Sequence, residues 1–460
     1  MRILQVSTYD TGGGAEAVAS QLFNEYRRRG HQSAMVVGEK RTSDPDIIPI
    51  SRRPSSGSWG RWASRLSDRL SSYEGRVRGV WRLRRWLQTY GAQPSNWWQV
   101  RLGRESLYFP ESWRLFELLE HRPDMLHCHN LHGGWLPRGG YIDLRALPWL
   151  SDQVPTMVTL HDTWLLSGHC AYTLGCERWK TGCGQCPDLS IYPALSRDGT
   201  SFNWKRKKEI FSRTRLYVVT PSRWLMCQVE QSILAPAILE ARVIPNGVDP
   251  TVFRPSSKEQ ARDCLGLPRS EKVLLFVANA AKSNVFKDYG TVRESFVRLA
   301  SRYRAQRVTL VILGEKSDPE QFQNGEIRFV AYQGDRQVTA KFYQAADVYV
   351  HAAKSDTFPN TVIEALACGT PVVATAVDGI PEQVDDGRSG FLVPAGDADA
   401  MCARVVQLLS DDVRRTSMGL TAAETASRSF DLKDQVEAYL GWYEQIVASK
   451  NENRSAAHAH

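Results

Sequence analysis

Short apolar runs alternate with helical patterns along this chain, and the alternation starts afresh after residue 245. The first series of runs covers 3–6, 33–38, 124–127, 156–160, 216–220 and 242–244. The second series covers 273–277, 308–313, 327–330, 348–350 and 372–375, with helical stretches at 289–303, 339–346 and 361–368. Strands that alternate with helices form parallel sheets covered on both faces. The pattern therefore predicts an α/β fold with two domains, and 460 residues suit two domains of roughly 200 residues each.

The turn-rich stretch IPNGVDPTVFRP separates the two series, because prolines, asparagine and glycine interrupt regular structure there. We expect an N-terminal domain over 1–245 and a C-terminal domain over 246–430. A final helix over 431–449 carries apolar residues at helical spacing, and we expect it to complete the first domain. The polar tail 450–460 is predicted to be disordered.

The overall composition is that of an ordinary globular protein, with 42% hydrophobic and 23% charged residues. No apolar run reaches the roughly 18 residues that a membrane-spanning helix needs. The first residues lead directly into an apolar run and a glycine loop, without the regions of a signal peptide. We therefore expect a cytoplasmic protein.

The segment 51–104 interrupts the first series and reads as a basic insertion. It holds twelve arginines and only two acids, Asp68 and Glu74. Its tryptophans are Trp59, Trp62, Trp81, Trp86, Trp97 and Trp98. Arginine with tryptophan on amphipathic helices suits an anionic membrane surface, which would make the protein peripheral at the inner membrane face. The same composition also fits a solvated face over a tryptophan core; binding to nucleic acid is disfavoured, because no nucleic-acid module is recognisable.

Four cysteines cluster in a loop over 169–187, at the spacing C-x5-C-x6-C-x2-C. They are Cys170, Cys176, Cys183 and Cys186. Four thiolates this close in sequence, with one C-x2-C pair, suit a structural zinc site. Reduced thiols that pack the loop, or labile disulfides, are the alternatives.

The stretch KSDTFPNTVIEALACGTPVVAT, residues 354–375, carries two acids on either side of a predicted helix start. The first helical amides, of Thr361 and Val362, offer a site for a diphosphate. Glu364 can accept hydrogen bonds from a ribose diol, and Asp356 can reach a sugar beyond the diphosphate. The two acids would then hold both ends of a nucleotide sugar. For an isolated pair, a capping acid and a solvated helix residue would be the simpler interpretation.

This acid, seven residues and then Glu resembles the signature of the family-four retaining glycosyltransferases. His161-Asp162 after a strand and the IPNGVD segment fit the same family. The cysteine-rich stretch that begins at His161 resembles a subset active in bacterial exopolysaccharide assembly, such as colanic-acid-type transferases. The resemblance implies the GT-B architecture, two facing Rossmann-like domains with parallel sheets. It also implies a nucleotide-diphosphate sugar donor and retention at the anomeric carbon.

The chain departs from the family pattern at three places. The first acid is usually Glu, and Phe-Pro replaces the commoner Phe-Gly. The family's diphosphate-binding pair is Arg and Lys, whereas this chain offers Lys287 for the lysine and Asn279 near the arginine, with Lys282 as a substitute. The resemblance assigns catalytic positions to His161, Asp356 and Lys287. The expected donor-binding residues are Gly13, Gly14, Asn279, Lys282, Lys287, Gly314, Asp356, Phe358, Pro359, Asn360, Thr361, Val362 and Glu364.

In the first domain, Gly12-Gly13-Gly14 follows the first strand and lets backbone approach a ligand closely. Packing of a tight turn is the alternative. His161 ends a strand, at the sheet edge where open α/β folds bind ligands, and Asp162 is expected to orient its ring. His127 and His129 also end a strand, and we expect these two residues and Asp162 on the acceptor side.

The leading hypothesis is a glycosyltransferase that transfers a sugar from a nucleotide-diphosphate sugar to a glycan or polyprenol-linked acceptor. Exopolysaccharide or cell-surface polysaccharide synthesis is the expected setting. No catalytic cofactor is expected, because we identify no Asp-x-Asp metal motif among the candidate site residues. A catalytically weak nucleotide-sugar-binding subunit is the alternative. A sugar-nucleotide epimerase of similar fold would lack the acid-to-Glu motif.

Overall fold

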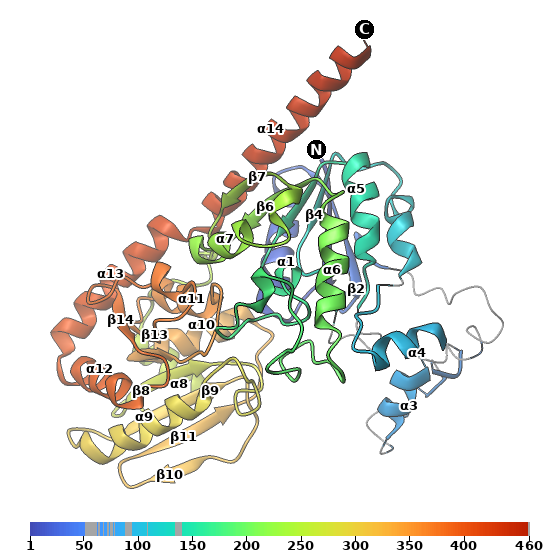
Figure 1. The fold of residues 1–460 in the computed structure, drawn as a ribbon. Helices are drawn as coiled ribbons and strands as arrows, with labels where there is room; N and C mark the ends of the chain where they lie inside the picture. The colour runs from blue at the N-terminus through green and yellow to red at the C-terminus, as the bar shows by residue number, and fades with distance from the viewer. Residues whose placement is uncertain are drawn as a thin grey trace. The chain divides into compact units, whose positions relative to one another are not determined.

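A computed structural model of the chain describes residues 1–50, 62, 65–67, 69–70, 73, 77, 79–87, 94–107, 109–133 and 140–458. The chain divides into two compact units (Figure 1). The first unit comprises residues 1–220, 225–243 and 440–460, and the second comprises 221–224 and 244–439. The main division falls two residues before the predicted boundary, so the turn-rich IPNGVD segment opens the second unit.

The described part of the first unit contains a seven-stranded sheet in the order β3-β2-β1-β4-β5-β6-β7, with every neighbouring pair parallel. Its strands are β1 (Arg2–Tyr9), β2 (Gln32–Glu39), β3 (Ile47–Pro49), β4 (Met125–Cys128), β5 (Thr156–Thr159), β6 (Leu216–Thr220) and β7 (Ile238–Val243). Its helices are α1 (Gly14–Arg28), α3 (Val80–Trp86), α4 (Pro94–Arg101), α5 (Leu147–Gln153), α6 (Thr200–Phe211) and α7 (Arg223–Glu230). The predicted strands are present, and β3 is a three-residue edge strand too short to give a pattern.

The described part of the second unit also contains a seven-stranded sheet, in the order β10-β11-β9-β8-β12-β13-β14, and only the β10–β11 pair is antiparallel. Its strands are β8 (Lys272–Val277), β9 (Val308–Leu313), β10 (Glu320–Phe322), β11 (Gly325–Val330), β12 (Val348–His351), β13 (Val372–Thr375) and β14 (Gly390–Val393). Its helices are α8 (Lys258–Leu265), α9 (Tyr289–Arg302), α10 (Arg336–Ala345), α11 (Asn360–Ala367), α12 (Ala398–Ser410) and α13 (Asp412–Ser429). Short 3-10 helices in the two units cover Pro110–Leu118, Leu144–Ala146, Trp164–Leu166, Arg178–Lys180, Ala235–Ala237 and Ile380–Glu382.

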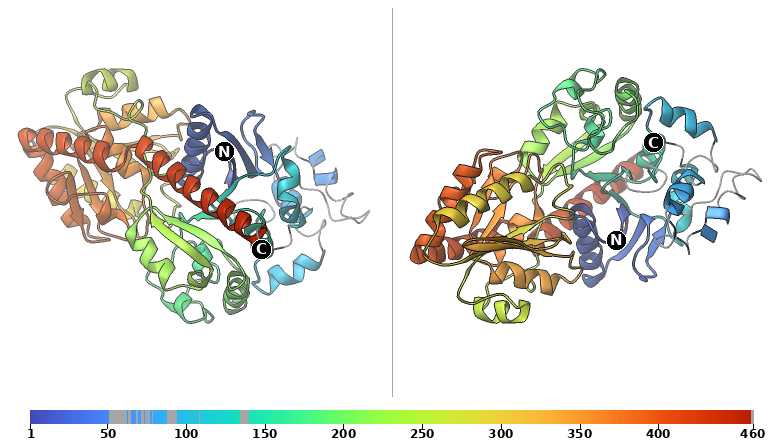
Figure 2. Two further views of the ribbon diagram at one scale, coloured as in Figure 1. Left: turned by 90° about the horizontal axis from the view of Figure 1, so that it is seen from above. Right: turned by 90° about the horizontal axis from the view of Figure 1, so that it is seen from below.

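Each sheet has helices on both faces, as the two views of Figure 2 show. Strand β8 shows how the sequence achieves this. Val273 and Leu275 pack into the core beneath α8, α10 and α11, whereas Leu274 and Phe276 pack into the core beneath α9 and α12. Because side chains alternate across a strand, a continuous apolar run fills two cores at once. The α/β prediction is confirmed.

The strand order reverses beside the first strand of each sheet. Strand β1 lies between β2 and β4, and β8 lies between β9 and β12. In open parallel sheets, ligands bind outside the carboxyl ends of the strands at such a reversal, because the connections on its two sides leave in opposite directions. The loops after β1, β4, β8 and β12 are therefore the places to look for a site.

The last helix, α14, runs from Leu432 to His458 and differs from its prediction in two ways. Residues 450–458 are helical rather than disordered, and the helix is divided between the two units at Tyr439 and Leu440. No proline or glycine follows Gly441, and extending a formed helix adds one hydrogen bond per residue without a new nucleation cost. No helix in the described residues combines the length and apolarity needed to cross a membrane.

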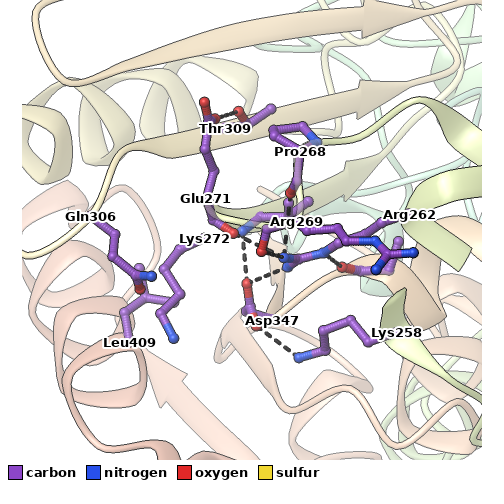
Figure 3. Close-up of polar contacts among 12 residues, drawn as sticks. Lys258, Arg262, Pro268, Arg269, Glu271, Lys272, Gln306, Thr309, Asp347 and Leu409 are labelled. Atoms are coloured by element: carbon purple, nitrogen blue, oxygen red, sulfur yellow. Dashed lines mark hydrogen bonds and ion pairs between the residues drawn. The ribbon is translucent and has the colours of Figure 1, made fainter. Parts of the chain in front are cut away.

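A buried carboxylate ties the start of β8 to the start of β12 (Figure 3). Asp347, only 3% exposed, accepts hydrogen bonds from the Val273 amide (2.8 Å), Arg262 Nη2 (2.7 Å) and Lys258 Nζ (2.7 Å). The Arg262 guanidinium also donates to the carbonyls of Ala345, at 3.0 Å, and of Arg269 and Glu271. Burial alone would raise the pKa of Asp347, but the two cations lower it, so the carboxylate stays ionised.

Replacing Asp347 with Asn should lower the free energy of unfolding by about 3–5 kcal/mol, because a buried guanidinium loses its counter-ion. Denaturant unfolding of the full chain measures this change. The matched control is Asp263→Asn, which removes a surface carboxylate paired with Arg269 and 49% exposed, and should leave the stability nearly unchanged. Equal losses in the two variants would contradict a special role for the buried carboxylate.

Candidate functional site

The loops that follow β8 and β12 are joined by backbone pairing. Lys287 and Ala353 form an antiparallel bridge. On either side of this bridge, the Lys354 amide donates to the Phe286 carbonyl (2.8 Å) and the Asp288 amide donates to the Ala352 carbonyl (3.0 Å). The pairing fixes the position of Lys287 relative to the loop that carries Asp356. Two residues 69 positions apart in sequence are thereby held together at the reversal point of the second sheet.

Lys287 Nζ donates to Asp356 Oδ2, so two predicted catalytic residues are in direct contact. His351 lies behind the pair: its Nε2 is 3.4 Å from Lys287 Nζ and 3.6 Å from Asp356 Oδ2. Burial alone would raise the pKa of Asp356, but Lys287 and His351 lower it to about 2. Burial, aided by Lys287, lowers the pKa of His351 to about 4. At neutral pH the Asp356 carboxyl is therefore ionised and the His351 imidazole is neutral.

The loop of Asp356 is anchored by Asp378, a residue that was not predicted. The Asp356 amide donates to Asp378 Oδ2 (3.0 Å), and the Ser355 hydroxyl donates to the same oxygen. The Gly379 amide donates to the Asp356 carbonyl, and a Cβ at Gly379 would lie 1.8 Å from the Thr357 carbonyl oxygen. Only glycine allows this close approach. The turn sequence Asp378-Gly379 was the available signal.

Helix α11 begins at Asn360, as predicted, and carries Glu364 one turn later. Asn246 of the IPNGVD segment donates from Nδ2 to Asn360 Oδ1 (2.9 Å), which explains why that segment accompanies the helix. Tyr343 donates from its hydroxyl to Glu364 Oε2 (2.9 Å). Burial raises the pKa of Glu364 to about 7, against the opposing influence of Tyr343 and Arg336. Glu364 is thus poised between its neutral and charged forms at physiological pH.

Three residues predicted to contact the donor make contacts within the protein. Phe358 lies in the core, 5% exposed, with its ring 5.7 Å from that of Phe430. Pro359 is buried and caps α11, and its carbonyl accepts from Gln383 Nε2 and from the Val362 amide (3.2 Å). The Val362 amide thus has a partner within the protein in this conformation, and its contact with a diphosphate stays a prediction. Pro359 is extended and precedes a short apolar helix, and the neighbouring Phe358 ring packs into the core. The sequence motif alone does not show this orientation.

The other expected donor residues lie around the ends of β8 and β9. Asn279 is exposed. Lys282 donates from Nζ to Ser317 Oγ (2.8 Å) and lies 4.2 Å from the centre of the Phe329 ring, so it belongs to the β9–β11 side. Gly314 has φ of +104°, and a Cβ there would lie 2.5 Å from a backbone carbonyl oxygen of residue 278. Gly314 is therefore required by the backbone, whether or not a ligand approaches it.

At the reversal point of the first sheet, the glycine loop leads from β1 into α1. Gly12 has φ of +126°, Gly13 is the N-cap of α1, and Gly13 and Gly14 are exposed. Glu16, which was not predicted, is 8% exposed and lies over Gly13, where an added Cβ would be 2.2 Å from its Oε2. Asn130 Nδ2 donates to Glu16 Oε1 (3.4 Å). Glu16 therefore links the loop after β1 to the loop after β4.

Three histidines stack across the ends of β4 and β5. The ring centroids of His127 and His129 are 4.1 Å apart, and those of His129 and His161 are 5.5 Å apart. His127 is fully buried, and both its ring nitrogens are engaged, by Thr159 Oγ1 (2.7 Å) and by Tyr443 OH of α14 (2.6 Å). In this structure both ring nitrogens of His127 therefore have partners within the protein, and its acceptor-side role stays a prediction. His129 is 1% exposed and pairs with His161 through Nδ1 and Nε2 (3.2 Å).

His161 retains partial exposure at the carboxyl edge of the sheet, as predicted. Burial lowers the pKa of His161 to about 4 and the pKa of His127 to about 3. These two imidazoles are therefore neutral at pH 7.

Asp162 does not orient the His161 ring as predicted; it pairs with His132. His132 Nε2 lies 2.6 Å from Asp162 Oδ2, and the Trp164 amide donates to Asp162 Oδ1 (2.8 Å). The other nitrogen of His132 is 3.2 Å from Tyr192 OH. Burial alone would lower the pKa of His132, but Asp162 raises it. No local sequence pattern indicated this pair, because 30 residues separate its members.

Lys207 of α6 secures the segment that follows Asp162. Its side chain is fully buried, and Nζ donates to the carbonyls of Trp164 (2.9 Å) and Ser167 (3.1 Å) and to Glu105 Oε1 (3.2 Å). The ammonium also lies 3.8 Å from the centre of the Trp164 ring. Burial lowers the pKa of Lys207, against Glu105, which raises it. A single lysine in an amphipathic helix gives no hint of such a role.

Replacing Asp162 with Asn should destabilise the chain by about 1–3 kcal/mol near pH 5.5, and by less near pH 8.5. Because the pKa of His132 is raised in the folded state, its pairing contributes fully to stability below pH 6.5, the ordinary pKa of histidine. This contribution is lost as the pH rises through the pKa of His132 in the folded protein. The pKa of Asp162 is lowered by His132 against burial, and its contribution is present above 3.8. Thermal unfolding at both pH values, with exposed Asp188→Asn as control, measures the difference. A pH-independent loss would contradict the ion pair.

The four clustered cysteines are partly buried and reduced. Cys183 Sγ accepts from the Gly168 amide (3.3 Å), and Cys186 Sγ lies 3.4 Å from His169 Nε2. Burial raises the pKa of Cys170 to about 12 and of Cys183 to about 11, so both are neutral thiols. Across the described ranges, no three His, Cys, Asp or Glu residues are grouped to hold a metal ion. The zinc site stays a prediction, which metal analysis of the purified protein tests directly.

Comparison with known proteins places this geometry in a class. A family model described as Glycosyltransferase Family 4 matches residues 12–252, and one described as Glycosyl transferases group 1 matches residues 271–411. The chain is 27% identical over 335 residues to the colanic acid biosynthesis glycosyl transferase WcaC of Escherichia coli K12, covering 70% of this chain and 77% of that protein. It is 34% identical over 200 residues to a D-inositol 3-phosphate glycosyltransferase of Corynebacterium aurimucosum, covering 40% of this chain and 47% of that protein.

Solved structures of similar fold cover nearly the whole chain. Anabaena HepE in complex with UDP has a TM-score of 0.61 at 13% identity, covering 97% of this chain and all of that one. WaaG, a glycosyltransferase involved in lipopolysaccharide biosynthesis, has a TM-score of 0.59 at 14% identity, covering 95% and 98%. Two Rossmann-like units, with candidate sites at their strand reversals, define a glycosyltransferase of the GT-B class. The chain belongs to glycosyltransferase family 4.

Proposed function

We propose that this glycosyltransferase is retaining and metal-independent, and that its donor is a nucleotide-diphosphate sugar. The acceptor in this proposal is a glycan or polyprenol-linked sugar of a bacterial exopolysaccharide or cell-surface polysaccharide. The observation that carries the proposal is the grouping of Lys287, Asp356 and Glu364 around the strand reversal of the second sheet. HepE has been solved with UDP and with UDP-glucose, and WcaC is named for colanic acid biosynthesis, which support this donor and this setting.

Each member of this group has a proposed role that suits its chemistry. Glu364 accepts hydrogen bonds from the ribose hydroxyls through its carboxylate. Lys287 neutralises charge on the diphosphate, and Asp356 accepts from hydroxyls of the transferred sugar. A preorganised ammonium near a leaving diphosphate stabilises charge that develops as the glycosidic bond breaks.

The proposed retaining mechanism needs no protein nucleophile. The acceptor hydroxyl attacks from the face that the diphosphate leaves, and a diphosphate oxygen takes its proton. The protein then contributes mainly by positioning the reactants and stabilising charge. In this proposal His161, which is uncharged at neutral pH, contacts the donor sugar without attracting the diphosphate into an unproductive ion pair. The chain has two Asp-x-Asp triplets, Asp44-Pro45-Asp46 and Asp397-Ala398-Asp399. Asp44 and Asp46 pair with Arg27, Asp397 caps α12 and Asp399 pairs with Arg298, and this engagement in structural contacts supports metal independence.

A catalytically weak nucleotide-sugar-binding subunit is the second candidate. It is favoured by Asp356 where the family usually has Glu, and by Asn279 where it usually has Arg. A donor panel of UDP-glucose, UDP-galactose, GDP-mannose and GDP-fucose, with lipid extract as acceptor, separates the two. Release of nucleotide that depends on the acceptor supports the enzyme, whereas binding without release supports the subunit.

Replacing Glu364 with Ala should weaken binding of the best panel donor by about 1–3 kcal/mol, because a charged hydrogen-bond acceptor is lost. Isothermal titration of wild type and variant near pH 8 measures the change. Glu294→Ala is the matched control, since Glu294 lies on α9, is 58% exposed and pairs with Arg298 of its own helix. Unchanged donor affinity in the Glu364 variant would refute the ribose assignment.

The basic insertion is proposed to bind an anionic membrane surface, where a lipid-linked acceptor would be found. Its described tryptophans Trp62, Trp81 and Trp98 are 50%, 50% and 62% exposed. Such exposure favours an interfacial role over a tryptophan core, because these rings combine an apolar body with a polar N–H. The exposed Arg65, Arg69 and Arg101 supply the complementary charge. Predictions for Trp59, Trp86 and Trp97 concern side chains outside the described residues.

The double variant Trp81→Ala with Trp98→Ala should sediment several-fold less with phosphatidylcholine vesicles that contain phosphatidylglycerol. Wild type should bind these vesicles more tightly than pure phosphatidylcholine, and salt should weaken the binding because charges are screened. Trp113→Ala is the control, an exposed tryptophan outside the insertion. Wild type that fails to sediment with either vesicle removes the membrane proposal and leaves the donor proposal intact.

A further inference from the structure

Tyr343 is a buried residue of α10 whose hydroxyl reaches the neighbouring helix. It is fully buried, and its OH donates to Glu364 Oε2 (2.9 Å). Its ring is held edge-on by two aromatic rings, of Phe253 (6.1 Å between centroids) and Tyr349 (5.5 Å). Its own carbonyl accepts from Thr370 Oγ1 (2.7 Å), the residue that links α11 to β13. The direction of the hydroxyl is therefore fixed by packing and not by Glu364 alone.

We infer that Tyr343 is a positioning residue for nucleotide binding, which holds one oxygen of the Glu364 carboxylate and so presents the group to the ribose in its charged form. The inference rests on the proposed function of Glu364. A free carboxylate at the start of a helix has several rotamers and, in an enclosed site, a tendency to take up a proton. One fixed O–H donor restricts the rotamers and favours the anion.

The surroundings of Glu364 explain why a single hydroxyl matters. The titratable and charged groups that face it are Tyr343 and Arg336 of α10, Tyr349 of β12, and Cys368 one turn further along its own helix. Burial raises the pKa of the carboxyl to about 7, while the Tyr343 hydroxyl and Arg336 oppose the increase. Removing the hydroxyl therefore raises the pKa of Glu364 further. At a given pH, a larger fraction of the protein then carries neutral Glu364.

The direction of the pH effect follows from the donor's chemistry. Ribose hydroxyls donate to the carboxylate, so the charged form of Glu364 binds the nucleotide and the protonated form has less to offer. Affinity should rise with pH through the Glu364 pKa and then become constant. A nucleotide-diphosphate sugar is the right probe, because its diphosphate has no titration in this range that would mimic the effect.

The test compares Tyr343→Phe with wild type by isothermal titration from about pH 6 to about pH 9, with the tightest-binding nucleotide sugar of the panel above. We expect the midpoint of the affinity profile to move upward by about one pH unit. Donor affinity should then fall roughly five- to tenfold near pH 7 and return to within about twofold of wild type near pH 9. A role limited to packing would lower affinity equally at every pH.

Two further variants separate the possible failures. Tyr303→Phe removes another buried tyrosine hydroxyl, which donates to the Leu409 carbonyl (3.2 Å), and should leave the profile unchanged. Glu364→Gln should abolish the pH dependence. If Glu364→Gln retains the wild-type profile, or wild type shows no pH dependence, both the ribose assignment and this inference fall. If Glu364→Gln abolishes the dependence but Tyr343→Phe keeps the wild-type midpoint or loses affinity uniformly, only the inference about Tyr343 is overturned.

Discussion

The pairing register between β8 and β12 determines where the candidate donor site forms. These strands are neighbours in space but are separated in sequence by two helices and three other strands. Asp347 fixes their starting ends by accepting from the Val273 amide, while the Asp347 amide donates back to the Val273 carbonyl (2.7 Å). At the far ends, the bridge between Lys287 and Ala353 continues the alignment. Since a one-residue slip would turn each side chain of β12 to the opposite face, this register is a condition for the contact of Lys287 with Asp356.

The two units place different electrostatic environments at their strand reversals. In the second unit, an ionised Asp356 faces Lys287, and Glu364 is balanced near neutral pH. In the first unit, His127 and His161 are neutral, because burial lowers both pKa values and outweighs the opposing charge of Asp162 at His161. Asp162 itself is engaged by His132. The result is an ammonium–carboxylate pair where a diphosphate is proposed to bind, and a neutral His161 imidazole beside the Asp162–His132 pair.

The sequence was sufficient for the fold because the short apolar runs are distinct and alternate regularly with helical patterns. Both central strands of each sheet, the first helix and α11 were predicted within a few residues, since their patterns do not depend on distant partners. The missed strands β3, β10 and β14 are three or four residues long and gain their stability from a neighbour already in place. The end of α14 was missed for a related reason. Its polar residues extend a helix whose earlier part is stabilised by packing of buried residues.

The candidate site was less predictable, because its contacts join distant segments. Asp356 and Glu364 were found from one local motif, whereas Asp378, His132, Glu16 and Tyr343 carry no local pattern. Asp162 was adjacent to His161 in sequence, yet neighbouring residues after a strand point in different directions, and its partner came from another loop. Phe358 was counted as a ligand contact, although an aromatic residue beside a core helix contributes more stability when buried.

The contact between Lys287 and Asp356 limits how a donor can bind, if the proposed roles hold. A single ammonium cannot fully neutralise both a carboxylate and a diphosphate. Donor binding must therefore share Lys287 between them, and the sugar hydroxyls must supply hydrogen bonds to the oxygen of Asp356 that the lysine releases. His351, neutral and tied through Nδ1 to the Tyr349 hydroxyl (3.0 Å), adds no second positive charge to this exchange. Full occupancy then requires the sugar and the diphosphate together, so a nucleotide diphosphate without its sugar leaves Asp356 competing with the phosphates for the same lysine.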